Sequence, residues 1–431
     1  MAGWTTGWEM AMNAHILGDR MNDKVNVFGP IKGTGHIMGR MTDHLRGVLH
    51  GMAVLALICG IGGVSAAIVL PTVALAQQSG ANKGSRDAPS DPLEKFLHQY
   101  ITHAGLPGGV VAIGYGEGRV RYAASGYASV RPETGMTDDR QFYIGSLTKM
   151  MTAVVTLQLA SEQRIDLADP IGKYLPDEYQ GRIANADRAT IRDLLRNSSG
   201  IPDYLDGEFF FELVGRDPQH GWRNVELLPL IADRDAYFAP GKSYAASNSN
   251  FILLGVMIEA VEGADIKAVF NRRIFEPARM RDTSFGRYPR PALLARGFDD
   301  ANGDGQLEDV TDYDVGDQLA DGGVISTAED MVKFARALFV DGVLLGPNAL
   351  ERATTDTAFT GEGSYGYGLM IGSSDWGPVW GHDGIYFGYS AEFSWFPEQE
   401  TVVVFLSNGR ALNEVPSVTS MLMTGLFGDP Q

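Results

Sequence analysis

The sequence predicts an α+β fold in which strands from both ends of the folded region form one antiparallel sheet. Two observations support this prediction. Strand-like runs separated by a glycine turn lie at 109–115 and 119–124, and strand-like runs return at 389–396 and 401–406. The stretch between these two groups is rich in helical periodicity. We therefore expect an α/β/α sandwich, with helices flanking the sheet and a helical subdomain inserted at 146–364.

The individual elements can be expected from local signals. We expect a β-sheet region at 91–145 and 365–428 of a domain spanning 91–428, and a polar linker at 77–90 before it. The expected helices, in chain order, cover 93–104 behind Asp91-Pro92, the run from Ser146, a short stretch from Thr190, the apolar run 250–262, 331–339 behind a capping box at 326–329, and 414–426.

The first 76 residues are predicted to be an N-terminal extension that contains a signal peptide or a membrane anchor. Arg40 and Arg46 precede an almost wholly apolar run at 48–70, and Ala74-Leu75-Ala76 then offers small residues for cleavage. An uncleaved anchor is the alternative, because the run is nearly long enough to span a bilayer. In both cases we expect an exported protein, periplasmic or secreted, with membrane contact only through this segment if it is uncleaved.

Composition excludes several classes of partner and site. The net charge of -18 makes nucleic acid an unsuitable partner. The single cysteine, Cys59, permits neither an intramolecular disulfide nor a cysteine-based metal site. Bulky Ile58 before it argues against a lipid-attachment box.

Ser146 and Lys149 are the first candidate catalytic pair. Their spacing of three residues puts a hydroxyl and an amine on one face of the first turn of a helix. Serine there can act as a nucleophile, and a lysine that loses its proton through burial can act as its base. The pair alone is weak evidence, because such pairs occur by chance.

Further motifs follow this pair in a fixed order. They are Ser199-Gly200-Ile201-Pro202 at a helix end, Pro240-Gly241 leading to Ser247-Asn248, Leu253-Leu254-Gly255, the run 322–330, and Gly381-His382-Asp383-Gly384. With them, the chain resembles the serine hydrolases related to class C β-lactamases and D-Ala-D-Ala carboxypeptidases, over about residues 91–428.

The resemblance implies a set of roles. Ser146 would attack a carbonyl and form an acyl-enzyme, and Lys149 would keep the site positive and help to move the serine proton. Asn248 would hold the substrate amide, and His382 would stand where many relatives carry lysine. The backbone N–H groups of Ser146 and Ile385 would form an oxyanion hole. No cofactor is implied.

One position departs from the family pattern. The family segment reads Tyr-x-Asn, and its tyrosine exchanges protons with the serine and the leaving group, whereas this chain carries Ala246 two residues before Asn248. Three interpretations stay open: a tyrosine replaced to disable the protein, a natural variant in which Lys149, water or Tyr244 takes over, and a non-catalytic protein that binds peptide or peptidoglycan.

The substrate-binding strand suggests a class of substrate. Asp383 follows His382 where lactamase-like members have threonine, and a carboxylate there would repel an anionic substrate. With Gly384, these residues are expected to contact the substrate. We expect a small peptide or other amide that is neutral or carries an amine; an esterase or a β-lactamase using the same residues is the alternative.

An acidic turn is a candidate calcium site. Asp300, Asn302 and Asp304 follow the start of an EF-hand loop, with Glu308 at the ninth position. The twelfth position is Thr311, where such a loop needs a bidentate glutamate. A structural calcium ion and a simple acidic turn are both open.

Overall fold

A computed structural model describes residues 91–427, except 208, 218–219, 287–291, 301–304, 314–318, 362, 414 and the side chain of 211. The predicted signal or anchor segment and the linker at 77–90 lie outside the described residues and stay predictions. Within the described part of the chain, no helix is both long and apolar enough to cross a membrane.

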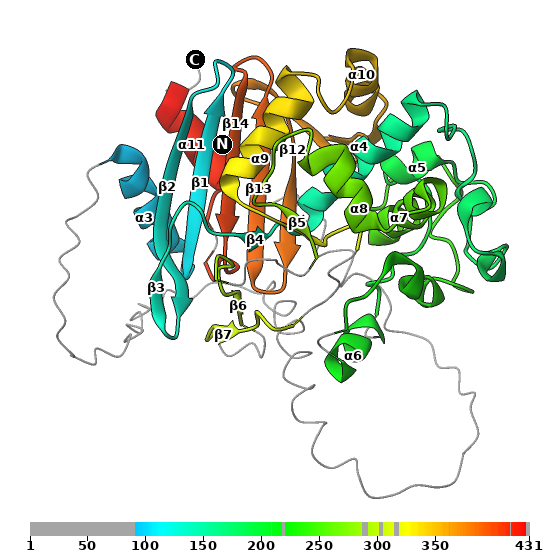
Figure 1. Cartoon of the computed structure of the whole chain (residues 1–431), viewed down its shortest axis with the longest axis horizontal. Coiled ribbons are helices and arrows are strands. Elements are labelled where there is room, and N and C mark those ends of the chain that lie inside the picture. The colour runs from blue at the N-terminus through cyan, green and yellow to red at the C-terminus, as the bar shows by residue number, and fades with distance from the viewer. Residues whose placement is uncertain are drawn as a thin grey trace, which may run out of the picture.

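A nine-stranded antiparallel sheet forms the centre of the fold, in the order β3-β2-β1-β14-β13-β12-β11-β10-β9 (Figure 1). Its strands are β1 (Gly108–Tyr115), β2 (Val120–Val130), β3 (Glu133–Gly135), β9 (Ala358–Phe359), β10 (Ser364–Tyr365), β11 (Met370–Ser374), β12 (Gly377–Tyr386), β13 (Tyr389–Phe396) and β14 (Thr401–Ser407). Because β1 pairs with β14, the two ends of the domain meet in one sheet, which confirms the predicted fold class. The C-terminal half of the sheet begins at Ala358, before the expected residue 365.

Alternating side chains of the central strands fill two separate cores, because successive residues of a strand point to opposite faces. Val111 of β1 and Val403 of β14 pack with α3 (Pro92–Ala104) and α11 (Val418–Phe427) on one face. Val110 and Val404 belong to the larger core on the other face, which includes residues of the helical region. The final helix starts at Val418 and not at the expected residue 414.

The helical region covers the second face of the sheet (Figure 1). Its α-helices are α4 (Thr148–Ser161), α5 (Ile191–Leu195), α6 (Phe209–Arg216), α7 (Asn248–Glu262), α8 (Ile266–Phe270), α9 (Ala328–Ala335) and α10 (Pro347–Thr355). Shorter helical turns are η2 (Gly145–Leu147), η3 (Ile171–Tyr174), η4 (Asp177–Tyr179), η5 (Asn224–Leu230), η6 (Asn271–Phe275) and η7 (Arg336–Val340). Small sheets join β4 (Phe142–Tyr143), β8 (Val324–Ser326) and β5 (Ser284–Phe285), and β6 (Phe298–Asp299) with β7 (Glu308–Asp309).

Two of these helices are buried on nearly all sides. Eleven of the fourteen residues of α4 are buried, and α7 has an unbroken buried run from Ser249 to Ile258. Helices that are apolar all round are typical of the interior of a domain. They are therefore rigid supports for the side chains at their N-termini.

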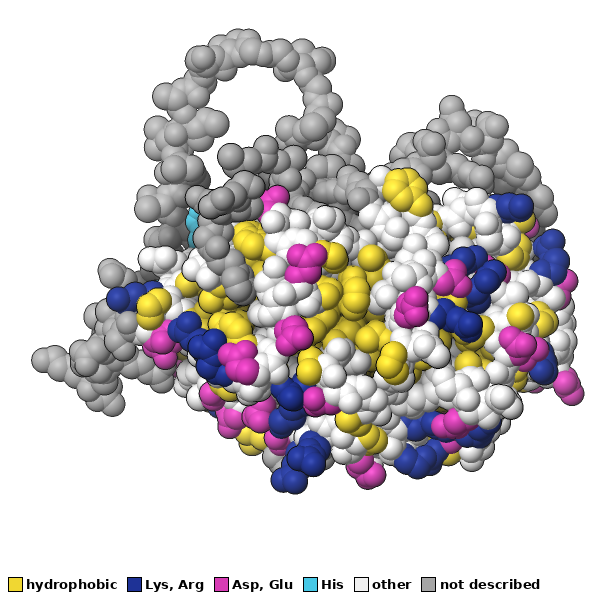
Figure 2. All heavy atoms as spheres, turned by 90° about the horizontal axis from the view of Figure 1, so that it is seen from above, with side chains coloured by type: hydrophobic (Ala, Val, Ile, Leu, Met, Phe, Trp, Pro, Cys, Tyr) yellow, Lys and Arg dark blue, Asp and Glu magenta, His cyan; other side chains and the backbone are white. Residues whose placement is uncertain are grey.

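The surface carries charges of both signs. Figure 2 shows the molecule from above: Lys and Arg side chains alternate with Asp and Glu around a strip of hydrophobic side chains. On this face the charges of the described residues are mixed in sign, and the absence of a nucleic-acid partner stays a prediction.

Candidate active site

Ser146 lies in the turn η2, between strand β4 and helix α4. Gly145 has φ +52°, a left-handed conformation that favours glycine. A Cβ atom on Gly145 would lie 2.5 Å from the backbone oxygen of Ile385. Glycine is therefore required here both by the turn and by the close approach of β12.

Ser146 and Lys149 are in direct contact, as their spacing predicts. Lys149 Nζ lies 2.7 Å from Ser146 Oγ and 3.1 Å from the backbone oxygen of Asp321. The lysine side chain is buried, and burial lowers its pKa, while the carboxylates of Asp321 and Asp203 oppose that shift. The geometry and the lowered pKa both favour a lysine that can accept a proton from the serine.

Two buried carboxylates beside Lys149 were not predicted from the sequence. Asp321 accepts a hydrogen bond of 2.9 Å from the Tyr204 hydroxyl through Oδ2. Burial raises the pKa of Asp321, and the Lys149 charge opposes the rise. The Asp203 carboxyl, also buried, has its pKa raised to about 6 by burial. The sequence signal for these two carboxylates was their position: Asp203 directly follows the segment Ser199–Pro202, and Asp321 directly precedes Gly322-Gly323.

Asn248 is the first residue of α7, and Asp203 holds it in place. The Asp203 Oδ2 atom accepts from the Asn248 backbone N–H at 3.0 Å and from its side-chain Nδ2 at 2.8 Å. Asp203 Oδ1 accepts from the Leu205 backbone N–H. The carboxylate thus caps the N-terminus of a buried helix and fixes the orientation of the Asn248 amide.

Ala246 lies on the exposed side of the segment that leads into α7, whereas Ala245 and Ser247 beside it are buried. Tyr244 packs 6.0 Å, centroid to centroid, from the ring of Tyr365. Burial raises the pKa of Tyr244, and no charged group opposes the rise. A phenol of this kind keeps its proton, so the described structure favours a packing role for Tyr244.

His382 lies in β12 with both ring nitrogens engaged. Nε2 is 2.9 Å from the Tyr365 hydroxyl, and Nδ1 is 2.7 Å from the backbone oxygen of Asp383. Burial and, to a smaller extent, the nearby Lys149 charge lower the His382 pKa to about 3. His382 is therefore neutral at physiological pH. It adds no positive charge to the site, in contrast to the lysine that the resemblance places there.

The residues after His382 bring β12 against the serine turn. A Cβ atom on Gly384 would lie 2.1 Å from the backbone oxygen of Ile144, so only glycine permits this contact. Asp383 and Ile385 alternate with the buried residues of the strand and are exposed, Ile385 by 51%. The predicted oxyanion-hole segments are thus adjacent in space.

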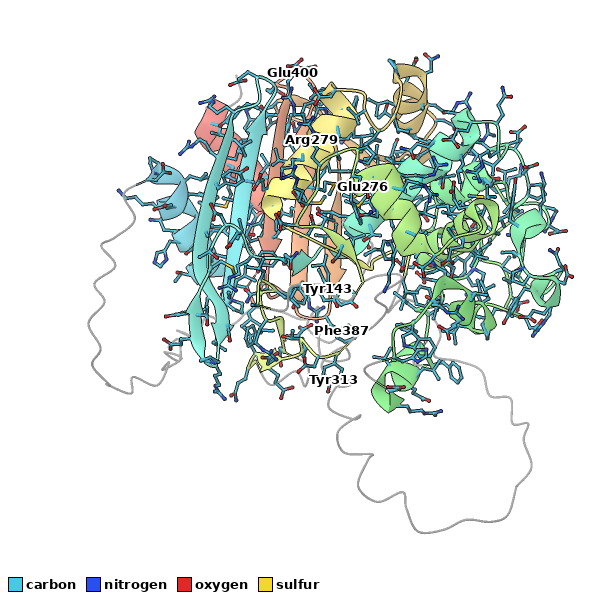
Figure 3. The ribbon with its side chains drawn as sticks, in the orientation of Figure 1. Tyr143, Glu276, Arg279, Tyr313, Phe387 and Glu400 are labelled. Atoms are coloured by element: carbon cyan, nitrogen blue, oxygen red, sulfur yellow. The ribbon has the colours of Figure 1, made fainter. Side chains whose placement is uncertain are left out.

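The aromatic side chains around the serine turn mark one end of the sheet. Figure 3 labels Tyr143 and Phe387 at this end and Glu400 at the opposite end. Tyr143 stacks on Tyr386 with ring centroids 4.2 Å apart, and Phe387 stacks on Tyr313 at 6.4 Å. Tyr313 is 45% exposed, so part of this aromatic surface is open to solvent beside β12.

The calcium prediction is only partly covered by the structure. Asn302 and Asp304 lie outside the described residues. Asp300 Oδ2 accepts from the Gly305 backbone N–H at 2.9 Å, and Glu308 is exposed in β7. Among the described residues, no three His, Cys, Asp or Glu side chains group as a metal site would require. The calcium site stays a prediction.

Comparison with known proteins identifies a family. The family model described as Beta-lactamase matches residues 93–423. Penicillin-binding protein 4* of Bacillus subtilis (strain 168) is 27% identical over 333 residues, which cover 71% of this chain and 69% of that protein. The D-aminopeptidase of Brucella anthropi is 27% identical over 326 residues, which cover 74% of this chain but only 60% of the aminopeptidase.

A solved structure supports the same relationship. The D-stereospecific amidohydrolase from Streptomyces sp. superposes with a TM-score of 0.68 at 28% identity. The match covers 78% of this chain and 98% of the amidohydrolase. The sheet and the helical region therefore form one fold that extends over nearly the whole of that enzyme.

Proposed function

Because the chain belongs to the beta-lactamase family, we propose that it is a serine hydrolase that cleaves an amide bond in a small substrate through an acyl-enzyme. The contact of 2.7 Å between Ser146 Oγ and Lys149 Nζ carries this proposal. The named relatives add support, since D-aminopeptidase and D-stereospecific amidohydrolase both denote enzymes that cleave amide bonds.

The chemistry would proceed in two steps. Neutral Lys149 accepts the Ser146 proton while Oγ attacks the substrate carbonyl; protonated Lys149 then gives that proton to the amine nitrogen, the C–N bond breaks and the acyl ester forms. Water then attacks the ester, releases the acid and returns the proton to Ser146. The backbone N–H groups of Ser146 and Ile385 would receive the negative charge of each tetrahedral intermediate, and such donors are worth about 10²–10³ in rate each.

Asn248 and its partner would orient the substrate. Asp203 accepts from the Asn248 backbone N–H and from one side-chain N–H, which leaves the Asn248 side-chain oxygen to accept from a substrate amide N–H. A fixed acceptor of this kind places the scissile carbonyl toward Ser146. This is the role that we propose for Asn248.

Proton delivery to the leaving amine would be the weak step. Ala246 supplies no proton at the position of the family tyrosine, and Tyr244 and His382 keep fixed protonation states. General acid–base assistance contributes typically about 10²–10⁴ in rate. We therefore propose that the protein forms the acyl-enzyme slowly and turns over poorly.

The charges around the site favour an amine-bearing or neutral substrate. Asp203 and Asp321 adjoin a single lysine, Asp383 is exposed on β12, and His382 is neutral. An anionic substrate such as a β-lactam would meet repulsion that Lys149 alone does not offset. We expect D-amino acid amides and short peptides with a free amino group to be better substrates than penicillins.

Intact mass spectrometry after incubation with a fluorophosphonate tests the proposal. We expect a mass increase on one peptide, the one that contains Ser146, and none in Ser146→Ala. Ser161→Ala, which removes a hydroxyl hydrogen-bonded within α4, is the matched control and should label like the parent. Absence of labelling in the parent and in Ala246→Tyr, together with tight peptide binding, would instead support a non-catalytic binding protein.

A further inference from the structure

A buried chain of polar side chains connects helix α7 to strand β12. Ser199 Oγ donates to Asn250 Oδ1 at 2.6 Å, and Asn250 Nδ2 donates to Asn197 Oδ1 at 2.8 Å. The Asn197 side chain in turn hydrogen-bonds Tyr365, which contacts His382. Each of these residues is buried. Buried polar networks are costly unless every member is satisfied, so this one fixes its members in one arrangement.

The hydrogen bonds of the network determine which nitrogen of His382 carries the proton. The Asp383 backbone oxygen can only accept, so Nδ1, at 2.7 Å from it, must be the protonated nitrogen. In the neutral ring Nε2 is then an acceptor, and the Tyr365 hydroxyl donates to it at 2.9 Å. Asn197 Oδ1 already accepts two hydrogen bonds, so its amide Nδ2 is the group that faces the phenol oxygen.

We propose that Tyr365 is a positioning residue, which holds His382 as the neutral Nδ1–H tautomer and thereby fixes β12 beside Lys149 and the serine turn. This inference rests on the proposed function, because it assigns Tyr365 to the acylation of Ser146. The ring planes of Tyr365 and His382 meet edge to face at 88°, with centroids 5.7 Å apart. That packing leaves His382 one orientation.

The position of His382 explains why its charge matters. The groups that face the pair are Lys149 from α4 and the phenol of Tyr244 against Tyr365. A proton on Nε2 would put a positive charge next to the amine of Lys149 and would make it harder for that amine to take up the serine proton. The donated Tyr365 hydrogen bond occupies Nε2 and disfavours that proton. Lys149 then keeps its direct contact with Ser146 without a charged imidazole beside it.

Imidazole ¹⁵N NMR of the full chain tests the pair directly, with His382→Gln used to assign the signal. We expect a proton on Nδ1, none on Nε2, and no titration of His382 between pH 5 and 8. A proton on Nε2, or titration near the ordinary histidine pKa of about 6.5, would overturn the assignment. This measurement needs no catalytic activity, so it fails or succeeds independently of the proposed function.

Fluorophosphonate labelling of Tyr365→Phe tests the positioning role. We expect the labelling rate of Ser146 to fall about tenfold, the effect of leaving one buried acceptor without its donor. The loss should deepen toward low pH, because His382 becomes easier to protonate. Tyr367→Phe is the matched control: its hydroxyl donates to Asp356 at 2.6 Å, and it should label like the parent.

The two measurements separate the possible failures. Equal labelling of Tyr365→Phe and Tyr367→Phe would overturn the positioning role, whereas no labelling of the parent or of Ala246→Tyr would overturn the proposed function. Circular dichroism checks that Tyr365→Phe is folded. If Tyr365→Phe does not fold, the ¹⁵N NMR measurement of the His382 tautomer in the parent protein still tests the proposal.

Discussion

The two walls of the candidate site differ in how completely they are built. On the wall formed by α4 and β12, Ser146, Lys149 and His382 each have defined hydrogen-bond partners and sit on buried elements. On the wall formed by residues 243–248, Asn248 is held by Asp203, but Ala246 presents an exposed methyl group. In the proposed mechanism the nucleophile and the strand beside it are thus preorganised, while Ala246 offers no group that could deliver a proton.

This difference shows that the arrangement of the first wall does not depend on the side chain at position 246. The hydrogen bonds of Lys149 and Asn248 go to Ser146, Asp321 and Asp203, and none depends on residue 246. Substitutions on one wall should therefore leave the hydrogen bonds of the other wall unchanged.

Removal of the base should have the largest effect. In Lys149→Met we expect fluorophosphonate labelling of Ser146 to fall by about 10²–10⁴, because no other described group is placed to accept the serine proton. Lys173→Met, at a surface lysine that pairs with Asp169, is the control and should label normally. Undiminished labelling of Lys149→Met would show that Ser146 reacts without Lys149 as its base.

Restoring a phenol on the second wall should give the next largest effect. In Ala246→Tyr we expect hydrolysis of a D-amino acid p-nitroanilide to rise by at least about 10², because a proton donor then faces the leaving amine. Residue 246 is exposed, so the larger side chain displaces no buried group. Ala246→Phe supplies the ring without the hydroxyl and should give no gain; equal gains in both variants would mean that shape, and not proton transfer, was missing.

Asp203 should determine how the rate depends on pH. Burial raises its pKa to about 6, so below that pH the carboxylate gains a proton and loses acceptor capacity for Asn248. We expect the labelling rate to fall as pH drops through about 6, and Asp203→Asn to lose this step and label about tenfold more slowly at pH 8. Asp206→Asn, at the neighbouring carboxylate that pairs with Arg234, should keep the step.

Much of this architecture is encoded in short segments of sequence. The strands β13 and β14 and the helices α3 and α7 follow local periodicity and capping, so they could be predicted to within two residues at most ends. The Ser146–Lys149 contact follows from helical spacing alone. The resemblance supplied the rest of the predicted residues, and the structure places Asn248 beside Asp203 and Ile385 beside Gly145.

The partners of these residues could not be predicted, because they come from distant parts of the chain. Asp321 reaches Lys149 across 172 positions, and Tyr365 reaches His382 from a neighbouring part of the sheet through a strand of only two residues. A two-residue strand carries no periodicity. The neutral state of His382 also depends on burial, which no local pattern reports.

Glu392 gives the smallest predicted effect: it lies opposite Asp383 on the neighbouring strand β13, and its carboxylate contacts α11. It is half-buried in β13 and accepts from the backbone N–H groups of Val418 and Thr419 at the start of α11. Burial raises its pKa above the ordinary 4.5, with the Thr419 backbone N–H opposing the rise. The folded state therefore binds the proton more tightly than the unfolded state, so this contribution to stability is complete below about pH 4.5 and is lost as pH rises through the folded-state pKa.

A glutamine at position 392 keeps one acceptor and never ionises. We expect Glu392→Gln to gain about 1 kcal/mol relative to the parent between pH 5 and pH 8, measured by urea unfolding at both pH values. The control is Glu398→Gln, at an exposed glutamate, which should not change the free energy of unfolding in this way. If the free energy of unfolding changed with pH in the same way in the parent, Glu392→Gln and Glu398→Gln, Glu392 would ionise in the folded state without cost.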